Sequence, residues 1–379
     1  MFILFDCLVV YSTVAAHMDD GAVPDGVWPE MPPAVVVLRD VPEDDFTHPH
    51  RRNLQSQQQK STANFFDLNP RCEQLGSRYC DYGPHNLGSG LEFASWAERT
   101  QFMYTNMVRQ DYTVFQKAPY NANYACTPAT KTPFFWSSEL TQASRFHSDE
   151  LMSFGIFQHE TATQNADLFG GSTDTFKRVR TFAVSIPNLG VAENVAGGSG
   201  TPWDTTKQWL ASQGHCQTIF SDMNFMGVGY AAGGKHGHYW TQNFLVASEN
   251  YYPIGQPIVA GTHDKLTSHT VRFFAHIATW TEAPSNVVVV VGGTTKTMTM
   301  LFGINTLGVY FVDVAIDSLP AHTDGCVSYH FEVNSGYSRM PYDTSYSFLT
   351  YGINGCTRNI GLAGICYGRN ILSRDAIVA

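Results

Sequence analysis

The periodicity of apolar residues changes at about residue 255, and this change constrains the fold more than any other feature of the sequence. Between about 95 and 248 the pattern predicts helices mixed with strands, whereas beyond 255 the helical period disappears and short strand-type runs follow one another. A chain of 379 residues is long enough for two domains. The sequence therefore predicts an α+β region followed by an all-β region.

The first region predicts three helices. Two are expected over 98–115 and 138–154 from their apolar spacing. The third has an N-terminal signal, since Thr201 can cap it and Pro202 occupies its first position, and Gly214 is expected to end it.

The strand-type runs predict two hairpins and an all-β domain. Residues 226–231 and 238–246 are expected to pair around Gly233-Gly234. In the second region several short strands separated by turns favour an immunoglobulin-like sandwich over 255–357. Its expected strands are 287–291 and 294–302, paired around Gly292-Gly293, then 309–316 and 326–333.

The two ends of the chain carry weaker patterns. Residues 1–16 are apolar and end in small residues, which predicts a signal peptide, although Asp6 interrupts the run and no basic residue precedes it. Residues 17–94 are rich in Pro and polar residues and are interpreted as a linker or pro-segment with a small Cys72–Cys80 loop. The domains are then expected at 95–248 and 255–357, with a tail at 358–379.

Charge and cysteine usage exclude several classes of function. The net charge of −10 and the absence of a basic stripe argue against a nucleic-acid partner. No run is long and apolar enough to predict a transmembrane helix. None of the eight cysteines is spaced Cys-x-x-Cys, and their dispersal favours disulfides in an oxidising, extracellular compartment, where Cys326 and Cys356 could pair.

Five short motifs follow one another between residues 138 and 242. They are the helix 138–152, Phe157-Gln158-His159, Ala192-Glu193-Asn194-Val195, Trp209 to His215 with its Ser-x-Gly-His end, and the strand pair Met226–Tyr230 and Gly237–Gln242. In this order they resemble the motifs of the CAP (SCP) superfamily of cysteine-rich secretory proteins, antigen 5 and plant pathogenesis-related proteins, in its bacterial-type branch. The resemblance implies a three-layer α-β-α sandwich over 95–248, a secreted protein and, less strongly, an appended β-sandwich.

The resemblance also implies a cleft onto which four residues converge. These are His159, Glu193, His215 and His238. The sequence departs from the family pattern in three places. Ala192 replaces a Gly, Ser212 stands where many animal and plant members have a second Glu, and Trp240 is inserted into a Gly-His-Tyr-Thr-Gln motif, which puts the orientation of His238 in doubt.

Each cleft residue has a structural interpretation beside its chemical one. Two neutral imidazoles and a carboxylate suit zinc, so His159 and His238 are the candidate metal ligands, with Glu193 as ligand or orienting partner. Otherwise the histidines make structural hydrogen bonds, Glu193 accepts backbone N–H groups, and His215 interacts with a helix C-terminus. His147, on the apolar face of its helix, is interpreted as a satisfied core residue. No residue is assigned as catalytic.

Three functions remain open at this point. The first is a secreted, non-enzymatic binding protein whose partner is a lipid or sterol, an extracellular protein or a wall component. The second is a secreted, metal-assisted hydrolase of protease type that uses the same cleft. The third is a wall- or matrix-associated protein in which the CAP domain is a scaffold.

Overall fold

The structure is a computed structural model that describes most of the chain between residues 94 and 350. The described residues are 35–38, 94–118, 120–183, 188–247, 257–279, 282–317, 319–321, 325–334, 336, 338–341 and 347–350. The predicted signal peptide, the Cys72–Cys80 loop and the predicted tail lie outside them.

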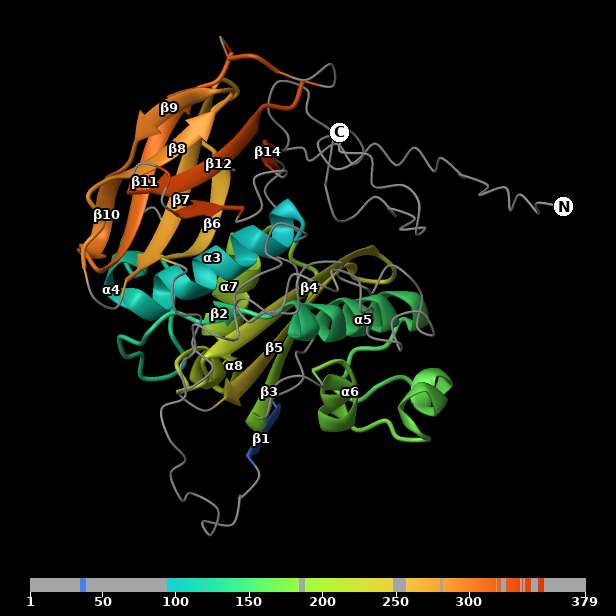
Figure 1. Cartoon of the computed structure of the whole chain (residues 1–379). Coiled ribbons are helices and arrows are strands. Elements are labelled where there is room, and N and C mark those ends of the chain that lie inside the picture. The colour runs from blue at the N-terminus through green and yellow to red at the C-terminus, as the bar shows by residue number, and fades with distance from the viewer. Residues whose placement is uncertain are drawn as a thin grey trace, which may run out of the picture.

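Six α-helices and one 3₁₀-helix are found among the described residues of the first region (Figure 1). They are α3 (Trp96–Gln110), α4 (Tyr112–Phe115), α5 (Ser138–Phe154), η4 (Thr163–Phe169), α6 (Thr175–Phe182), α7 (Pro202–Leu210) and α8 (Gln213–Ile219). The helix predicted over 138–154 is confirmed as α5. Ser137 caps it by accepting from Leu140 N, and Gly155 ends it with φ of 63°.

Two predicted helix boundaries are wrong. The helix expected over 98–115 breaks at Asp111, whose side chain accepts from Thr113 N and starts α4. The helix that begins at Thr201 ends at Leu210 rather than at Gly214. Gly214 instead lies inside α8, because Ser212 in an extended conformation begins a new helix there.

A mixed five-stranded sheet forms the centre of the first region. Its order is β1-β3-β5-β4-β2, with β1 (Val35–Leu38), β2 (Phe135–Trp136), β3 (Asn188–Gly197), β4 (Phe225–Gly233) and β5 (Gly237–Ala247). The predicted β4–β5 hairpin is confirmed. Strand β1 belongs to the segment interpreted as a linker. Its Val-Val-Val-Leu run, which suits a strand, pairs antiparallel with β3 so that Val35 lies opposite Glu193.

Helices lie on both faces of this sheet, and strand alternation decides which residues meet them. On one face Ser148 of α5 donates to Thr241 of β5 at 2.9 Å. On the other face Gln242, the next residue of β5, donates to Thr105 of α3 at 2.8 Å. Successive residues of β5 therefore anchor helices on opposite sides of the sheet.

The second region contains two further sheets. One has the order β10-β11-β7-β6, and the other has β13-β12-β8-β9 with β14 also paired to β12. The strands are β6 (Ile258–Lys265), β7 (Thr270–Ala278), β8 (Val287–Val291), β9 (Thr294–Thr297), β10 (Thr299–Ile304), β11 (Leu307–Ala315), β12 (Ser328–Val333), β13 (Ser338–Met340) and β14 (Phe348–Leu349). The α+β character of the chain is thus observed, while the immunoglobulin-like identity of this region stays a prediction.

The strand predicted over 294–302 is in fact two strands. The hairpin around Gly292-Gly293 is confirmed, since β8 pairs with β9. The chain then changes sheets at Met298, which is 5% exposed, and continues as β10 beside β11. The side chain of Met298 enters the core, so the single run breaks where it crosses between the two sheets.

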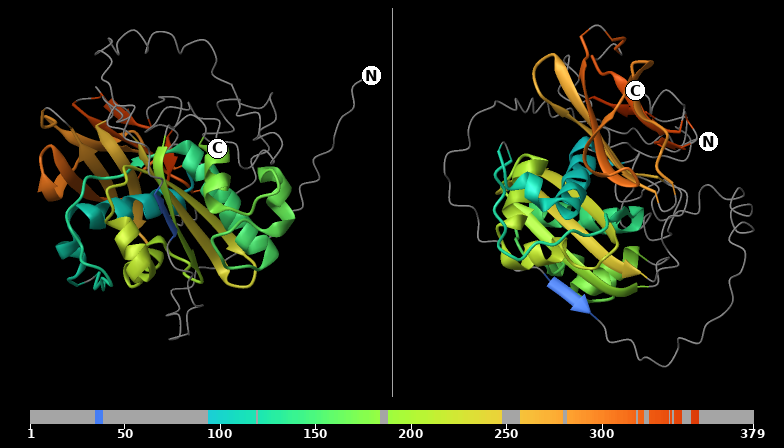
Figure 2. Two further views of the ribbon diagram at one scale, coloured as in Figure 1. Left: turned by 90° about the horizontal axis from the view of Figure 1, so that it is seen from below. Right: turned by 90° about the vertical axis from the view of Figure 1, so that its left-hand side faces the viewer.

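Helix α3 lies between the central sheet and the β-region (Figure 2). One face of α3 bonds to β6. The side chains that do so are spaced four residues apart and are Trp96, Thr100 and Tyr104. Trp96 Nε1 donates to the His263 carbonyl at 2.9 Å, and the Thr100 and Thr262 hydroxyls lie 2.7 Å apart.

The opposite face of α3 belongs to the first region. The side chain of Asn106 bonds to both the N–H and the carbonyl of Phe134, at 2.7 and 3.0 Å. One continuous hydrophobic core therefore includes residues of both regions.

Disulfides support part of the cysteine interpretation. Cys126 and Cys216 are bonded, with Cα atoms 5.7 Å apart, and link the loop before β2 to α8. Cys326 is also disulfide-bonded, and its predicted partner Cys356 lies outside the described residues. No helix in the described part of the chain has the length and apolar character that a membrane span requires.

Candidate functional site

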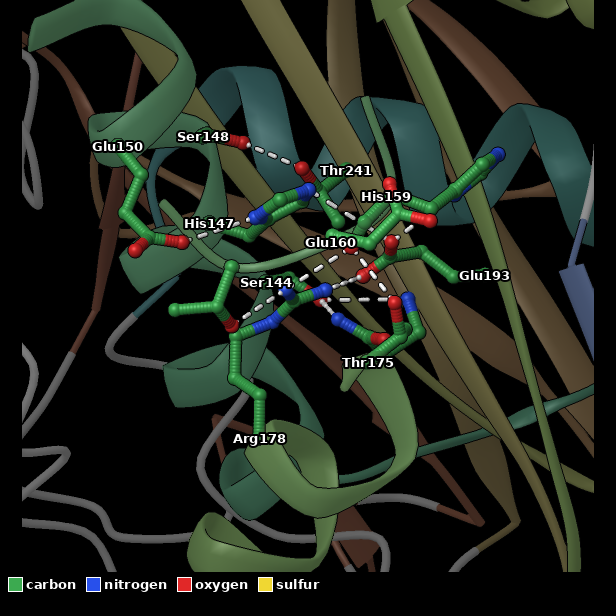
Figure 3. A network of polar contacts seen from close by, with 12 residues as sticks. Ser144, His147, Ser148, Glu150, His159, Glu160, Thr175, Arg178, Glu193 and Thr241 are labelled. Atoms are coloured by element: carbon green, nitrogen blue, oxygen red, sulfur yellow. Dashed lines mark hydrogen bonds and ion pairs between the residues drawn. The ribbon is translucent and has the colours of Figure 1, made fainter. Parts of the chain in front are cut away.

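A buried network of charged side chains gathers around Glu193 of β3 (Figure 3). Arg178 of α6 donates to Glu193 Oε2 at 2.5 Å, and Nδ1 of His159, in the loop after α5, lies 3.0 Å from Oε1. Arg178 and Glu193 are completely buried, and His159 is 4% exposed. The strand, the helix and the loop are therefore joined through one carboxylate.

The electrostatics of the network keep Glu193 ionised. Burial alone would raise its pKa, because a charged carboxylate is poorly solvated there. The guanidinium of Arg178 outweighs this effect together with His147 and the hydrogen bond from His159, and the pKa of Glu193 falls to about 2. A carboxylate with this pKa is a poor proton acceptor at neutral pH, which argues against its use as a general base.

His147 of α5 forms a second layer of the same network. Its Nδ1 lies 3.0 Å from Glu150 Oε2, and its Nε2 lies 3.0 Å from the Gln158 carbonyl and 3.7 Å from Glu193 Oε1. Both ring nitrogens of His147 therefore have an oxygen partner inside the protein. The interpretation of His147 as a satisfied core residue is confirmed, and it also faces Glu193.

Glu150 and Arg178 fasten the segment that follows α5. Glu150 Oε1 accepts from Ala162 N at 3.2 Å and from Asn165 Nδ2 at 2.8 Å. Arg178 Nη1 donates to the His159 carbonyl at 3.0 Å and to the Thr161 hydroxyl at 2.9 Å. These bonds hold the loop against α5 and α6, which is a structural role for both Glu150 and Arg178.

Two nitrogens of the network, in His159 and in Arg178, have no hydrogen-bond partner among the described residues. The Nδ1–H tautomer of His159 donates to Glu193, and its Nε2 is buried with no hydrogen-bond partner among the described residues. A buried polar nitrogen without a partner is unfavourable.

His238 does not join this network, which corrects the prediction of a single cleft. Glu193 lies directly opposite Asn243 in the β3–β5 pair, and Asn243 bonds to Ser144 of α5. His238 is five residues before Asn243 on an uninterrupted strand, so its side chain points to the other face. There its Nδ1 lies 2.7 Å from the Tyr230 hydroxyl, and burial lowers the pKa of His238.

Relative to the Gly-His-Tyr-Thr-Gln motif that residues 237–242 resemble, the additional residue Trp240 changes the spacing of His238. In Gly-His-Tyr-Thr-Gln the His and the Gln are three residues apart and lie on opposite faces of a strand. Here His238 and Gln242 are four residues apart and share a face. An insertion of one residue moves a side chain to the other side of the sheet.

His215 also lies away from Glu193, and its predicted position at a helix C-terminus is wrong. It lies in the first turn of α8 and is completely buried. Its carbonyl is 3.4 Å from Asn194 Nδ2, which also bonds to Gln242. His215 therefore lies on the face of the sheet that Asn194 faces. Glu193, the residue before Asn194 in β3, makes its contacts on the opposite face.

The predicted zinc ligands do not fit one ion. His159 and His238 project from opposite faces of the sheet, and the Nδ1 atom of each is engaged, by Glu193 and by Tyr230. Across the described residues no group of three or more His, Cys, Asp or Glu side chains could hold a metal ion.

Sequence reasoning missed Arg178 and the role of Glu150. Glu150 was detectable in principle, because it follows His147 by three residues on a predicted helix and such pairs share a face. Arg178 stands in a short basic run, 177–180, whose pattern does not distinguish the buried Arg178 from the exposed Lys177 or the half-buried Arg180.

The comparisons with known proteins concern the region that holds this network. Residues 120–244 match the profile of the cysteine-rich secretory protein family, CAP. A relative in Bacillus subtilis (strain 168), "Uncharacterized protein YkwD", is 29% identical over 107 residues, which cover 28% of this chain and 37% of that protein.

A solved structure was also found. It is an extracellular protein containing a SCP domain from Bacillus anthracis str. Ames, with a TM-score of 0.29, 18% identity and 40% coverage of each chain. The profile match and the B. subtilis relative agree with the motif order read from the sequence. Residues 120–244 of this chain therefore form a domain of the CAP, or cysteine-rich secretory protein, family.

Proposed function

We propose that this is a secreted protein that acts by binding an extracellular partner and not by hydrolysis. The observation that carries the proposal is the state of Glu193. Both of its oxygens are engaged by buried partners, and its pKa of about 2 leaves it ionised and weakly basic at neutral pH.

The hydrolase alternative would need a base or a bound metal at the same place. The separation of His159 from His238 counts against the two-histidine ligand pair on which that alternative depended. Helix α3 packs against both regions and joins them into one body. Such a body suits a protein that presents a binding surface. An extracellular location accords with the disulfide between Cys126 and Cys216.

The test measures turnover and binding on the same preparation of full-length chain. Casein and a peptide library are incubated with wild type and with Glu193→Gln, with and without Zn²⁺. We expect no turnover above the buffer rate in any sample. Zinc-dependent turnover by wild type that disappears in Glu193→Gln, with the variant still folded by circular dichroism, would overturn the proposal.

Binding is measured by sedimentation with sterol-containing phosphatidylcholine vesicles and with purified cell-wall material. Saturable binding to either one supports the proposal and names the partner class, whereas binding to neither contradicts its lipid and wall versions. Zinc titration by calorimetry of wild type and His238→Ala is expected to give identical traces, because His238 shares no site with His159.

A further inference from the structure

The outer edge of β3 in the central sheet is covered in two different ways along its length. Strand β3 pairs with β5 on its inner side and with the short strand β1 on its outer side. Residues 190–197 of β3 are buried. A strand in this position has a row of outward N–H and C=O groups that need partners, so what covers each part of the row decides what can bind there.

The bonds made by Asn243 of β5 show which residues of β3 face outward. Ser144 Oγ accepts from Asn243 N at 3.2 Å and donates to the Gly227 carbonyl of β4 at 3.2 Å. The backbone groups of Asn243 therefore point toward β4 and away from β3. Because Glu193 lies opposite Asn243, its own backbone groups point away from β5, to the outer edge.

Helix α7 covers the far part of this edge. The carbonyl of Val195 accepts from Trp209 Nε1 at 3.0 Å, and the carbonyl of Gly197 accepts from Gln208 Nε2 at 3.2 Å. Both carbonyls belong to odd-numbered residues, which share one direction along a strand. The part of the outer edge that α7 leaves for another partner is residues 190–193, which we call the β3 window.

Strand β1 lies along the β3 window, and Figure 2 shows it in blue at the margin of the central sheet. Val37 lies opposite Val191, an outward-facing residue, so the N–H of Val37 points toward β3. The same holds for Val35, which lies opposite Glu193. The N–H of Val36 points away from β3, because these directions alternate along a strand.

Strand β1 is held in the window by this pairing and not by a turn. The helices α3 to α6 and strand β2 come between β1 and β3 in the chain, so no hairpin fixes the position of β1. The strand has four residues, of which three are Val and none is charged or Pro. Few hydrogen bonds hold so short a strand, and each contributes little in water. Another extended segment with the same character can therefore replace it without a change in the rest of the domain.

We propose that the β3 window is a docking site for an extended, uncharged segment of a partner protein, rich in β-branched residues, which pairs with residues 190–193 in place of β1. The class of partner follows from the occupant. Alternating N–H and C=O groups are matched by the backbone of another polypeptide, and β1 shows the type of segment that fits.

This inference rests on the binding function proposed above and names a protein as the partner. The two proposals can nevertheless fail separately. Turnover of casein would overturn the proposed function and leave docking at the β3 window unaffected. Failure of docking at the window would leave the binding of lipid or wall material unaffected.

The experiment measures amide hydrogen exchange of residues 190–193 by mass spectrometry in the full-length chain. Val37→Pro removes the N–H that points toward β3, and exchange in the window should become at least about tenfold faster than in wild type. Val36→Pro is the matched control, because it removes an N–H that points away, and its exchange should stay close to that of wild type.

Docking is then tested by adding a synthetic peptide of residues 33–40 at millimolar concentration. The peptide should restore slow exchange in Val37→Pro. It should change wild type little, because β1 of the same chain competes for the window at a high effective concentration. A peptide that itself carries Val37→Pro should have no effect.

Three results would overturn the proposal. One is equal exchange in wild type and Val37→Pro, or equal acceleration in both proline variants, because β1 would then not hold the window. The second is a peptide that fails to restore slow exchange, or whose proline form restores it equally well. The third is faster exchange that spreads from the window to β5, because β1 would then be part of the fold and not a replaceable occupant.

Discussion

Substitution of Glu193 by Gln is the sharpest test of the structural role assigned to the buried network. The amide is close in shape to the carboxylate but carries no charge, and its NH₂ group would face the donors of Arg178 or His159. The guanidinium of Arg178, which is completely buried, would lose its counter-ion. We therefore expect a large loss of stability without a change of fold.

The size of the expected loss of stability follows from the pKa of Glu193. A fall from 4.5 to about 2 in the folded protein corresponds to about 3 kcal/mol of stability at pH 7, at about 1.4 kcal/mol per pH unit. Removal of one partner from a buried ion pair costs about 3–5 kcal/mol in other proteins, which agrees with this value.

The pH dependence distinguishes this mechanism from simple loss of packing. The pKa of Glu193 is lower in the folded state than in the unfolded state. The contribution of its charge to stability is therefore complete above about pH 4.5 and decreases as the pH falls towards 2. At pH 3 the contribution should be about 1 kcal/mol. The difference in stability between wild type and Glu193→Gln should therefore shrink by more than half between pH 7 and pH 3.

Urea unfolding at several pH values measures this difference, with fluorescence of the buried Trp136, Trp209 and Trp240 as the signal. Glu160→Gln is the control, because its side chain is exposed and its contact with Gln158 is made by the backbone carbonyl, which the substitution keeps. A loss below about 1 kcal/mol at pH 7, or a difference that does not change with pH, would refute the reasoning.

Two further predictions concern packing. Gly227→Ala should cost about 3 kcal/mol or more in urea unfolding, because a Cβ there would lie 2.1 Å from Thr141 N in the α5 backbone. Gly155→Ala, with open space around it but φ of 63°, should cost only about 1 kcal/mol, and equal losses would contradict the close approach of β4 to α5. A chain truncated after residue 248 should lose cooperative thermal unfolding and near-ultraviolet circular dichroism, since the face of α3 that bonds to β6 would be exposed. Retention of a sharp transition would show that the first region folds alone.

Local signals predicted the elements well where the determinants are close in sequence. The bounds of α5 follow from its apolar spacing, from Ser137 and from Gly155, all within one short segment. The Gly292-Gly293 turn is likewise determined by residues next to one another in the sequence. The break at Met298 was not predictable, because it depends on which of two sheets each half of the run joins.

The site was predicted only in part, because its contacts join residues that are far apart in the sequence. The contact between His159 and Glu193 agrees with the motif order, whereas His238 lies on the opposite face of the sheet, which its register in β5 decides. Arg178 could not be assigned to Glu193 from the sequence, because α6 reaches β3 only in the folded chain.

The position of α3 limits how this protein can change during evolution. The family match begins at residue 120, after the end of α3 at Gln110. A genetic exchange that replaced the β-region alone would leave Trp96, Thr100 and Tyr104 facing a surface for which they were not selected. Replacement of the β-region alone is therefore expected to destabilise α3, and substitutions in α3 are constrained by two neighbours at once.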